Sequence, residues 1–280
     1  MKETIFDNVN ERVVQSLSER PEAVFDTRYL KESANSGSSA VQSDLCNRTP
    51  LNLTLPGQFI SALNLALTAE YLVTEFYSRG LNTPGLIPND LRLVFMRILL
   101  NEVGARETLL TLLGDNAFAK PMFDFTARGA VASPFSSFTT FLNLGRAFED
   151  LIVRAYKGQA GNVMSDDYVL LTALRFHSVH ARHASELRRI SGLLPYITLD
   201  NRDGLPAAFQ GIYRGEDNIV QGGLNLVSLT GFSAEKVSQA FDEPLTADEV
   251  MFNLSPFIRT RRGFGPFNPR RDDDDGNNKK

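Results

Sequence analysis

The sequence predicts an all-α protein built around a four-helix bundle. Four segments between residues 57 and 192 have apolar residues at helical spacing, and each is bounded by glycine, proline or a capping residue. Each segment is roughly 23–28 residues long, which at about 1.5 Å per residue gives rods of roughly 35–40 Å. Hydrophobic residues make up 42% and charged residues 22% of the chain, as in ordinary globular proteins. Amphipathic rods of matched length favour a bundle.

The ends of these helices are predicted from helix-stop and helix-start residues. Gly80, Gly114 and Gly158 are interpreted as the stops of the first three helices, and Asn89 as the N-cap of the second. The fourth helix begins after Ser165 and ends near residue 192. The connection over residues 115–134 is longer than a tight turn and is long enough to cross the bundle. The predicted helices span residues 57–79, 89–113, 135–157 and 166–192.

The chain outside the bundle is predicted to form extensions. The N-terminal part is polar, with room for two short helices and a Ser/Gly-rich linker. After the bundle, short helices are expected over residues 232–241 and from Thr246, which has capping-box spacing to Glu249. The predicted divisions are an N-terminal extension (1–52), the bundle (53–192), a C-terminal helical extension (193–258) and a disordered charged tail (259–280).

Composition excludes several classes of function. The chain has 29 Lys and Arg against 33 Asp and Glu, a formal net charge of −4, which argues against a nucleic-acid-binding surface. The single cysteine, Cys46, excludes an intramolecular disulfide and a multi-cysteine metal site. No apolar run reaches the length of about 18 residues that a membrane span needs. The start, "MKETIFDNVNERVVQ", has no signal-peptide core, so a cytoplasmic location is expected, and an exported chain from which a leader has been removed is the open alternative.

Charged or imidazole side chains lie on the apolar stripe of each predicted bundle helix. The first three helices place Glu70, Glu102 and Glu149 among apolar neighbours three, four and seven residues away. The fourth contains all three histidines of the chain in "HSVHARH" (177–183), and His180 and His183 share its inward face. Burying an unpaired charge costs several kcal/mol. Five such residues at similar depth therefore favour a metal site over chance.

Other interpretations of these residues stay open. A single stripe glutamate can reach the surface or pair with an arginine such as Arg106 or Arg182, and a single histidine on a helix face is more often a core residue than a ligand. Asp150, between Arg146 and Arg154, is interpreted as part of a solvated charge ladder.

Several strings resemble one known family. "LNLALTAEYLVTEFY" (63–77), "ILLNEVGARETLL" (98–110), "AFEDLIVRAYKG" (147–158) and "ARHASELR" (181–188) resemble, in order, the four bundle helices of bacterial ferritin-like domain proteins related to desiccation-associated plant proteins. "FDEPLTADEVMFNLSPF" (241–257) is similar to their C-terminal helical segment. The resemblance covers roughly residues 53–258 and implies a ferritin-like bundle.

The resemblance also implies a ligand set. Ferritin-like metal sites take one glutamate from each of two helices and a Glu-x-x-His motif from each of the other two. Glu70, Glu102, Glu149 and His183 match that set. Two positions depart from it, because Ala105 replaces a ligand histidine and His180 replaces a bridging glutamate.

These departures favour one metal ion over two, held by Glu102, Glu149, His180 and His183. Glu70 would then lie outside the ligands. Mixed nitrogen and oxygen ligands suit iron or manganese, and zinc less well.

Two functions remain open at this point. The first is a ferritin-like protein with a reduced metal site and a stress or redox role, which would handle iron or peroxide if it turns over. The second is a scaffold without metal or catalysis, acting in assembly or in desiccation and stress protection. A monomer or small homo-oligomer is expected rather than a closed cage.

Overall fold

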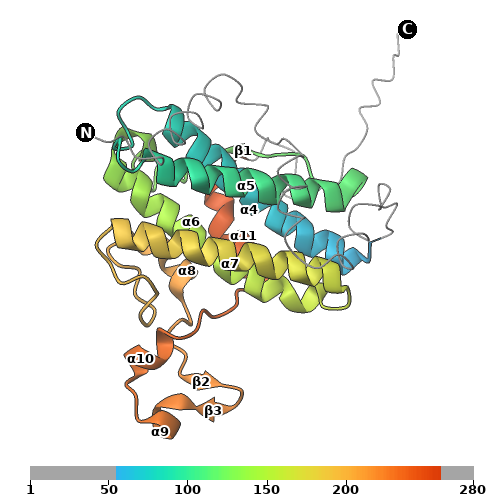
Figure 1. The fold of residues 1–280 in the computed structure, drawn as a ribbon, viewed down its shortest axis with the longest axis vertical. Helices are drawn as coiled ribbons and strands as arrows, with labels where there is room; N and C mark the ends of the chain where they lie inside the picture. Colours follow the sequence, from blue (N-terminus) through green and yellow to red (C-terminus); the bar gives the residue numbers. More distant parts are fainter. Residues whose placement is uncertain (1–54, 260–280) are drawn as a thin grey trace, which may run out of the picture. The chain divides into compact units, whose positions relative to one another are not determined.

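The computed structural model describes residues 55–259, so the predicted N-terminal extension and, apart from Arg259, the predicted charged tail lie outside the described residues. This part of the chain is mostly helical and contains the expected bundle (Figure 1). The bundle consists of α4 (Gly57–Asn82), α5 (Arg92–Leu113), α6 (Phe138–Val163) and α7 (Asp167–Ile190). Helix α4 packs against α5 and α6, and α6 packs against α7. The all-α prediction is confirmed.

Two glycines that were predicted to end helices lie inside them instead. Helix α4 continues through Gly80, where a Cβ atom would come within 2.3 Å of the Phe141 ring. Helix α6 continues through Gly158, where a Cβ atom would lie 1.8 Å from the carbonyl oxygen of Leu245. Both residues are therefore glycine because another part of the chain packs directly on the helix. The predicted stops at these positions are wrong.

The true helix starts follow capping chemistry in most cases. Ser137 caps α6 by accepting from the Thr140 amide, and Asp166 caps α7 by accepting from two amides of its first turn. Asn89 is not the N-cap of α5, because that helix begins three residues later at Arg92 and has no side-chain cap. The predicted helix stop at Gly114 is confirmed, with its positive φ of 52°.

The connection between α5 and α6 crosses the length of the bundle, as its length allowed. It contains the short elements η1 (Gly114–Asn116), β1 (Met122–Phe123) and η2 (Pro134–Ser136). At one end, Asn64 of α4 donates to the Asn116 carbonyl and accepts from the Phe118 amide. At the other end, Phe138 packs its ring against Phe95, near the start of α5. Helices α5 and α6 therefore run in the same direction.

The C-terminal extension adds short elements around the bundle. The helix at Thr246 has the predicted capping box with Glu249, and the helix expected over 232–241 is shorter than predicted. Strand β1 pairs antiparallel with β4, and β2 pairs antiparallel with β3. The elements are η3 (Ala207–Phe209), α8 (Gln210–Tyr213), β2 (Val220–Gln221), β3 (Leu224–Asn225), α9 (Leu226–Thr230), α10 (Ala234–Ser238), α11 (Ala247–Leu254), η4 (Ser255–Phe257) and β4 (Ile258–Arg259).

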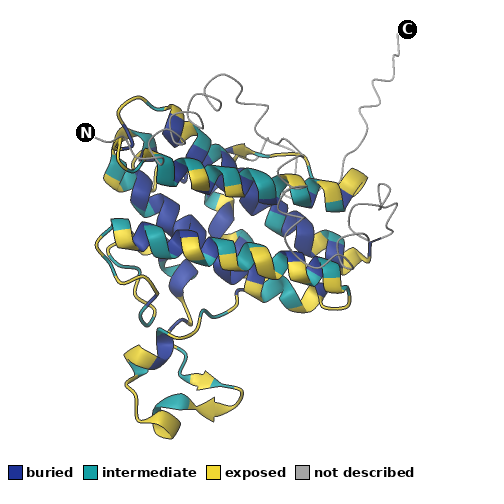
Figure 2. Cartoon of the chain, in the orientation of Figure 1, coloured by how far each residue is buried: buried dark blue, intermediate teal, exposed yellow. Residues whose placement is uncertain are grey.

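Aromatic side chains fill the core at the crossing connection. Phe76 of α4 is fully buried and stacks on Phe141 with ring centroids 4.6 Å apart. Its ring also contacts Phe148 of α6 and Phe125 of the connection. Figure 2 shows buried inner faces and half-buried to exposed outer faces for α5 and α7, whereas the middle parts of α4 and α6 are buried almost all round. Each buried aromatic ring removes about 150–250 Å² from water, so this cluster is a main source of bundle stability.

Buried arginines attach the C-terminal extension to the bundle. Arg154 of α6 donates to the carbonyls of Ile212 and Arg214 and forms a 2.6 Å ion pair with Glu216. Arg188 of α7 forms a 2.6 Å ion pair with Asp150, which is only 3% exposed. The prediction of a solvated ladder at Asp150 is therefore wrong, because the extension covers this side of α6.

Candidate metal centre

All five residues singled out from the sequence meet inside the bundle. Glu70 comes from α4, Glu102 from α5, Glu149 from α6, and His180 and His183 from α7. All five are buried, and none is more than 6% exposed. Helical periodicity places each of them on the inner face of its helix, and the matched helix lengths bring them to one level.

His180 bridges two carboxylates. Its Nδ1 atom lies 2.8 Å from Glu149 Oε2, and its Nε2 atom lies 3.0 Å from Glu70 Oε1. The Nε2 atom is also 3.6 Å from Glu102 Oε2. A carboxylate only accepts hydrogen bonds when it is ionised, so two such contacts require a proton on both ring nitrogens. Without a metal ion, His180 therefore lies at this centre as an imidazolium between anions.

His183 approaches Glu102 in a different way. Its Nδ1 atom is 2.7 Å from Glu102 Oε1 and 3.5 Å from Glu149 Oε2. Neither His183 Nδ1 nor either carboxylate oxygen of Glu102 has a hydrogen-bond partner, although all three atoms are buried. The short contact therefore lacks hydrogen-bond geometry. The outer nitrogen, Nε2, lies 3.0 Å from the Asn101 side-chain amide, which fixes the direction of the ring.

Two tyrosines complete the centre, and the sequence reasoning missed them. The Tyr77 hydroxyl of α4 donates to Glu149 Oε1 at 2.6 Å, and the Tyr156 hydroxyl of α6 donates to Glu70 Oε1 at 2.6 Å. Each tyrosine follows the glutamate of its own helix by seven residues and binds the glutamate of the other helix. Two helical turns separate residues seven apart, so Glu-x₆-Tyr on both helices was the available signal. The Tyr156 ring also stacks on His180 at 5.5 Å.

Burial and neighbouring charges shift the pKa values of Glu102 and Glu149 in opposite directions. Burial raises the pKa of Glu102 well above its ordinary value; His180 opposes this rise and nearby carboxylates add to it. Burial also acts to raise the pKa of Glu149, but contacts with His183 and His180 outweigh it and hold that pKa at about 2. For His180, burial disfavours the cation, yet the surrounding glutamates outweigh it and raise the pKa. Glu102 is thus the carboxyl group that most lacks a cation.

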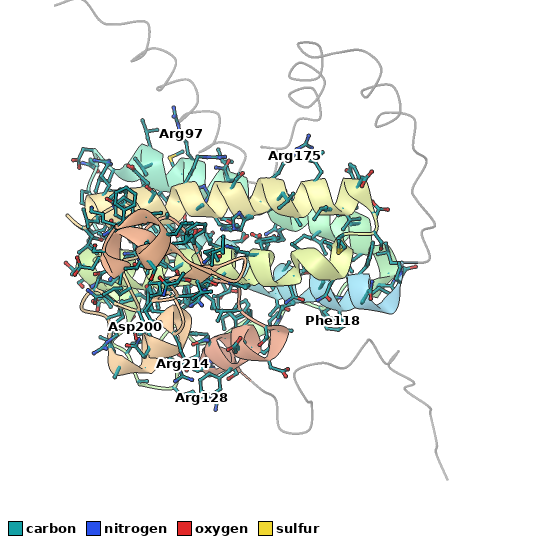
Figure 3. The ribbon with its side chains drawn as sticks, turned by 90° about the horizontal axis from the view of Figure 1, so that it is seen from below. Arg97, Phe118, Arg128, Arg175, Asp200 and Arg214 are labelled. Atoms are coloured by element: carbon teal, nitrogen blue, oxygen red, sulfur yellow. The ribbon has the colours of Figure 1, made fainter. Side chains whose placement is uncertain are left out.

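The alternative of arginine partners is not realised among residues 55–259. The ion pairs of the three glutamates in this region are all with histidine. Arg106 pairs instead with Glu107 at 2.6 Å. Figure 3 shows Arg97 of α5 and Arg175 of α7 pointing away from the bundle. The three glutamates of the centre therefore form their ion pairs with His180 and His183 and not with these arginines.

The donor atoms fit a single cation. Glu102, Glu149, His180 and His183 each offer one ligand atom, and these atoms all lie within 4.8 Å of one another. Glu70 is not among these four; it contacts His180 through Oε1, while its Oε2 atom is buried without a partner. Buried polar atoms are nearly always hydrogen-bonded. Several unpartnered acceptors around one point are therefore what a metal site without its ion would leave.

A small apolar cavity adjoins the centre beside Tyr156. Its volume is about 20 Å³, and its wall is almost entirely apolar. Side chains of α4 and α6 contribute most of the lining, including Ala66, Ala69 and Ile152. A volume of this size holds about one water-sized molecule, so the centre is enclosed by packed apolar groups on this side.

A four-helix bundle with carboxylates and histidines from all four helices in its core defines the ferritin-like class. Residues 59–193 match the family model described as a ferritin-like domain, and this part of the chain is a ferritin-like domain. No curated protein matches the chain at a significant level. No helix among the described residues is both long and apolar enough to cross a membrane.

Proposed function

We propose that the ferritin-like domain binds one metal ion, iron or manganese, through Glu102, Glu149, His180 and His183. The observation that carries the proposal is a set of buried ligand atoms without hydrogen-bond partners. His183 Nδ1 and Glu102 Oε1 lie 2.7 Å apart in the bundle core and form no hydrogen bond. An unpaired buried carboxylate costs several kcal/mol. A cation between these groups removes that cost.

Formal charge supports one ion rather than two. A histidine ligand must be neutral, so ligation through His180 requires the loss of its extra proton. The three glutamates then sum to −3, which one divalent or trivalent cation largely neutralises. A second ion would need the position that the His180 ring already occupies, between Glu70 and Glu149. Ala105 is buried where the matching motif would offer a second imidazole, and its methyl group has no donor atom. We therefore assign Glu70 to holding His180 rather than to direct ligation.

Redox chemistry is the activity that we propose for the bound ion. A bound iron or manganese ion would supply electron exchange with a small oxidant such as peroxide, which zinc does not offer. Tyr77 and Tyr156 fix the orientation of Glu149 and Glu70 through short hydrogen bonds. Asn101 fixes the ring of His183. We propose a role in handling iron or peroxide during stress, in the cytoplasm.

A metal-free scaffold is the second candidate, and one observation favours it. His180 accounts for both of its ring nitrogens with carboxylates, and the tyrosines bind one oxygen of each of those carboxylates. Half of the centre is thus satisfied without a metal. In this case the bundle would be a stable platform for assembly or desiccation protection.

Metal stoichiometry separates the two candidates. The purified full chain is incubated with Fe(II), Mn(II) or Zn(II), desalted and measured by elemental analysis. We expect about one iron or manganese ion per chain. His183→Ala removes a proposed ligand and should abolish retention. His177→Ala is the matched control, because His177 lies on the same helix outside the centre and should leave retention unchanged.

A second variant distinguishes the loss of a ligand from misfolding of the chain. Glu102→Gln keeps the side-chain shape but removes the charge, so it should lose the metal while circular dichroism stays that of the wild type. A ratio near zero for every metal would contradict the metal proposal and leave the scaffold. A ratio near two would contradict the single-ion assignment and would bring Glu70 into the ligand set.

A further inference from the structure

A cavity lies between helices α6 and α7 and the C-terminal extension. Its volume is about 160 Å³. Ala181 and Ala184 of α7 line it on the side of the bundle, and Tyr196 and Ile197 line it on the side of the extension. A cavity of about 150 Å³ accommodates a benzene-sized molecule, so this one has room for a ligand of roughly six to eight non-hydrogen atoms. We call it the extension cavity.

Arg188 of α7 contributes a buried cation to the extension cavity. Its side chain lines the cavity and is only 1% exposed. Its Nε and Nη2 atoms donate to the two carboxylate oxygens of Asp150, and its Nη1 atom donates to Asp203 Oδ2. A guanidinium group has five N–H donors. One N–H on each Nη atom is therefore left over for a ligand.

Asp150 also lines the cavity, but both of its carboxylate oxygens already accept hydrogen bonds. In addition to Arg188, the Tyr213 hydroxyl donates to Asp150 Oδ2 at 2.7 Å. This buried ion pair therefore offers a ligand the remaining N–H groups of the guanidinium rather than a free carboxylate.

Asp242 contributes a carboxylate without a partner to the same cavity. The residue is half-buried and lines the cavity. Within residues 55–259, neither a hydrogen bond nor an ion pair reaches its carboxylate, and Lys157 donates to its main-chain carbonyl instead. Burial raises the pKa of the Asp242 carboxyl group, and three nearby basic side chains lower it by less than burial raises it. This carboxylate therefore lacks a cation.

We propose that the extension cavity binds a small aliphatic α-amino acid. The carboxylate of the ligand accepts from the free N–H groups of Arg188, and its ammonium group donates to Asp242. Hydrogen bonds between charged groups are the strong ones. The aliphatic side chain of the ligand packs against the apolar wall at Val153, Ala181 and Ala184. A zwitterion thus satisfies both charged groups without adding net charge to the cavity.

Other classes of ligand satisfy the cavity less completely. A metal ion finds a single free carboxylate here, which is too few ligand atoms for a site. Asp242 repels a simple carboxylic acid, and a simple amine leaves the free N–H groups of Arg188 unused. A purely apolar molecule leaves both charged groups without a partner, which is unfavourable in a cavity that excludes water.

The extension cavity is separate from the metal centre. Ala181 and Ala184 follow His180 and His183 in sequence and therefore lie on the next face of α7. None of the five residues of the centre lines the cavity. The ligand contacts α6, α7 and the extension at once, so we expect it to stabilise the attachment of the extension whether or not metal is bound.

Isothermal titration calorimetry of the full chain with L-valine tests the proposal. We expect one L-valine per chain with a dissociation constant between about 10 µM and 1 mM, the range for a ligand of this size. Isobutylamine lacks the carboxylate and 3-methylbutanoate lacks the ammonium group, so each should bind at least about tenfold more weakly. L-tryptophan is too large for the cavity and should not bind.

Two pairs of variants locate the site. Asp242→Asn should weaken L-valine binding at least about tenfold, whereas Asp217→Asn, at an exposed acid of the same extension, should leave it unchanged. Ala181→Leu fills the cavity and should abolish binding. Its control is Ser178→Leu, at an exposed position of the same helix, and circular dichroism checks that each variant keeps its helices.

Three results would each overturn the proposal. The first is neither heat nor a rise in Tm with L-valine or L-alanine at about 10 mM, well above the expected dissociation constant. The second is isobutylamine binding as tightly as L-valine, which would mean that Arg188 takes no part. The third is unchanged L-valine binding by folded Asp242→Asn and Ala181→Leu variants, which would place the ligand elsewhere.

Discussion

Replacing Gly158 by alanine should destabilise the protein, although alanine is the better helix former. A Cβ atom at this position would lie 1.8 Å from the Leu245 carbonyl oxygen, 2.8 Å from its carbonyl carbon and 3.2 Å from its amide nitrogen. All three atoms are backbone, so no side-chain rotation relieves the contact. The segment at Leu245 must move away from α6 by more than about 1 Å to reach an ordinary van der Waals distance.

That movement breaks two hydrogen bonds between α6 and the Leu245 segment. The Leu245 amide donates to the Arg154 carbonyl at 3.1 Å, and the Arg154 side chain donates to the Glu243 carbonyl at 2.7 Å. Each is worth about 1 kcal/mol net, or more where the charged guanidinium donates. The higher helix propensity of alanine offsets less than about 1 kcal/mol of this loss. We expect Gly158→Ala to lower the free energy of unfolding by about 2–4 kcal/mol.

Gly161 is the matched control in the same helix. A Cβ atom there would meet nothing within 4 Å, so Gly161→Ala should stabilise by about 0.5–1 kcal/mol. In differential scanning calorimetry, Gly158→Ala should lower Tm by about 5–10 °C and Gly161→Ala should raise it by about 1–4 °C, at roughly 2–4 °C per kcal/mol. If both substitutions raise Tm, the close contact between α6 and the Leu245 segment does not exist.

Two further predictions concern charge. Arg188→Met leaves Asp150 without its 2.6 Å buried partner and should cost about 3–5 kcal/mol in urea unfolding. Arg189→Met removes an arginine whose side chain is 65% exposed and should leave the free energy of unfolding almost unchanged. Equal costs would contradict the buried pair. In the metal-free protein, the raised pKa of His180 contributes stability that is complete below its unfolded value near 6.5 and is lost as pH rises through the folded value. The lowered pKa of Glu149 contributes stability above its unfolded value of 4.5, which is lost as pH falls toward about 2. Tm of the metal-free chain should therefore peak between about pH 4.5 and 6.5, and a Tm that rises steadily from pH 6.5 to 10 would contradict the imidazolium between Glu70 and Glu149.

The sequence by itself determined the bundle and the residues at its centre. Helical periodicity depends only on neighbours along the chain, so the inner face of each helix could be predicted from spacing alone. Glu70, Glu102 and Glu149 were found because a charge on an apolar stripe stands out. The capping box at Thr246 was found for the same reason, since its two partners are three residues apart.

Only the tertiary structure decided which groups pair across helices. The hydroxyl of Tyr77 reaches a glutamate 72 positions away, and no local pattern specifies such a contact. Gly158 and Asp150 were misinterpreted because the C-terminal extension, about 90 and 60 residues further along, packs on α6 at both positions. Helix propensity describes a glycine or an aspartate in water. Burial by a distant segment reverses that local preference, because steric overlap and desolvation outweigh the few tenths of a kcal/mol by which most residues differ in a helix.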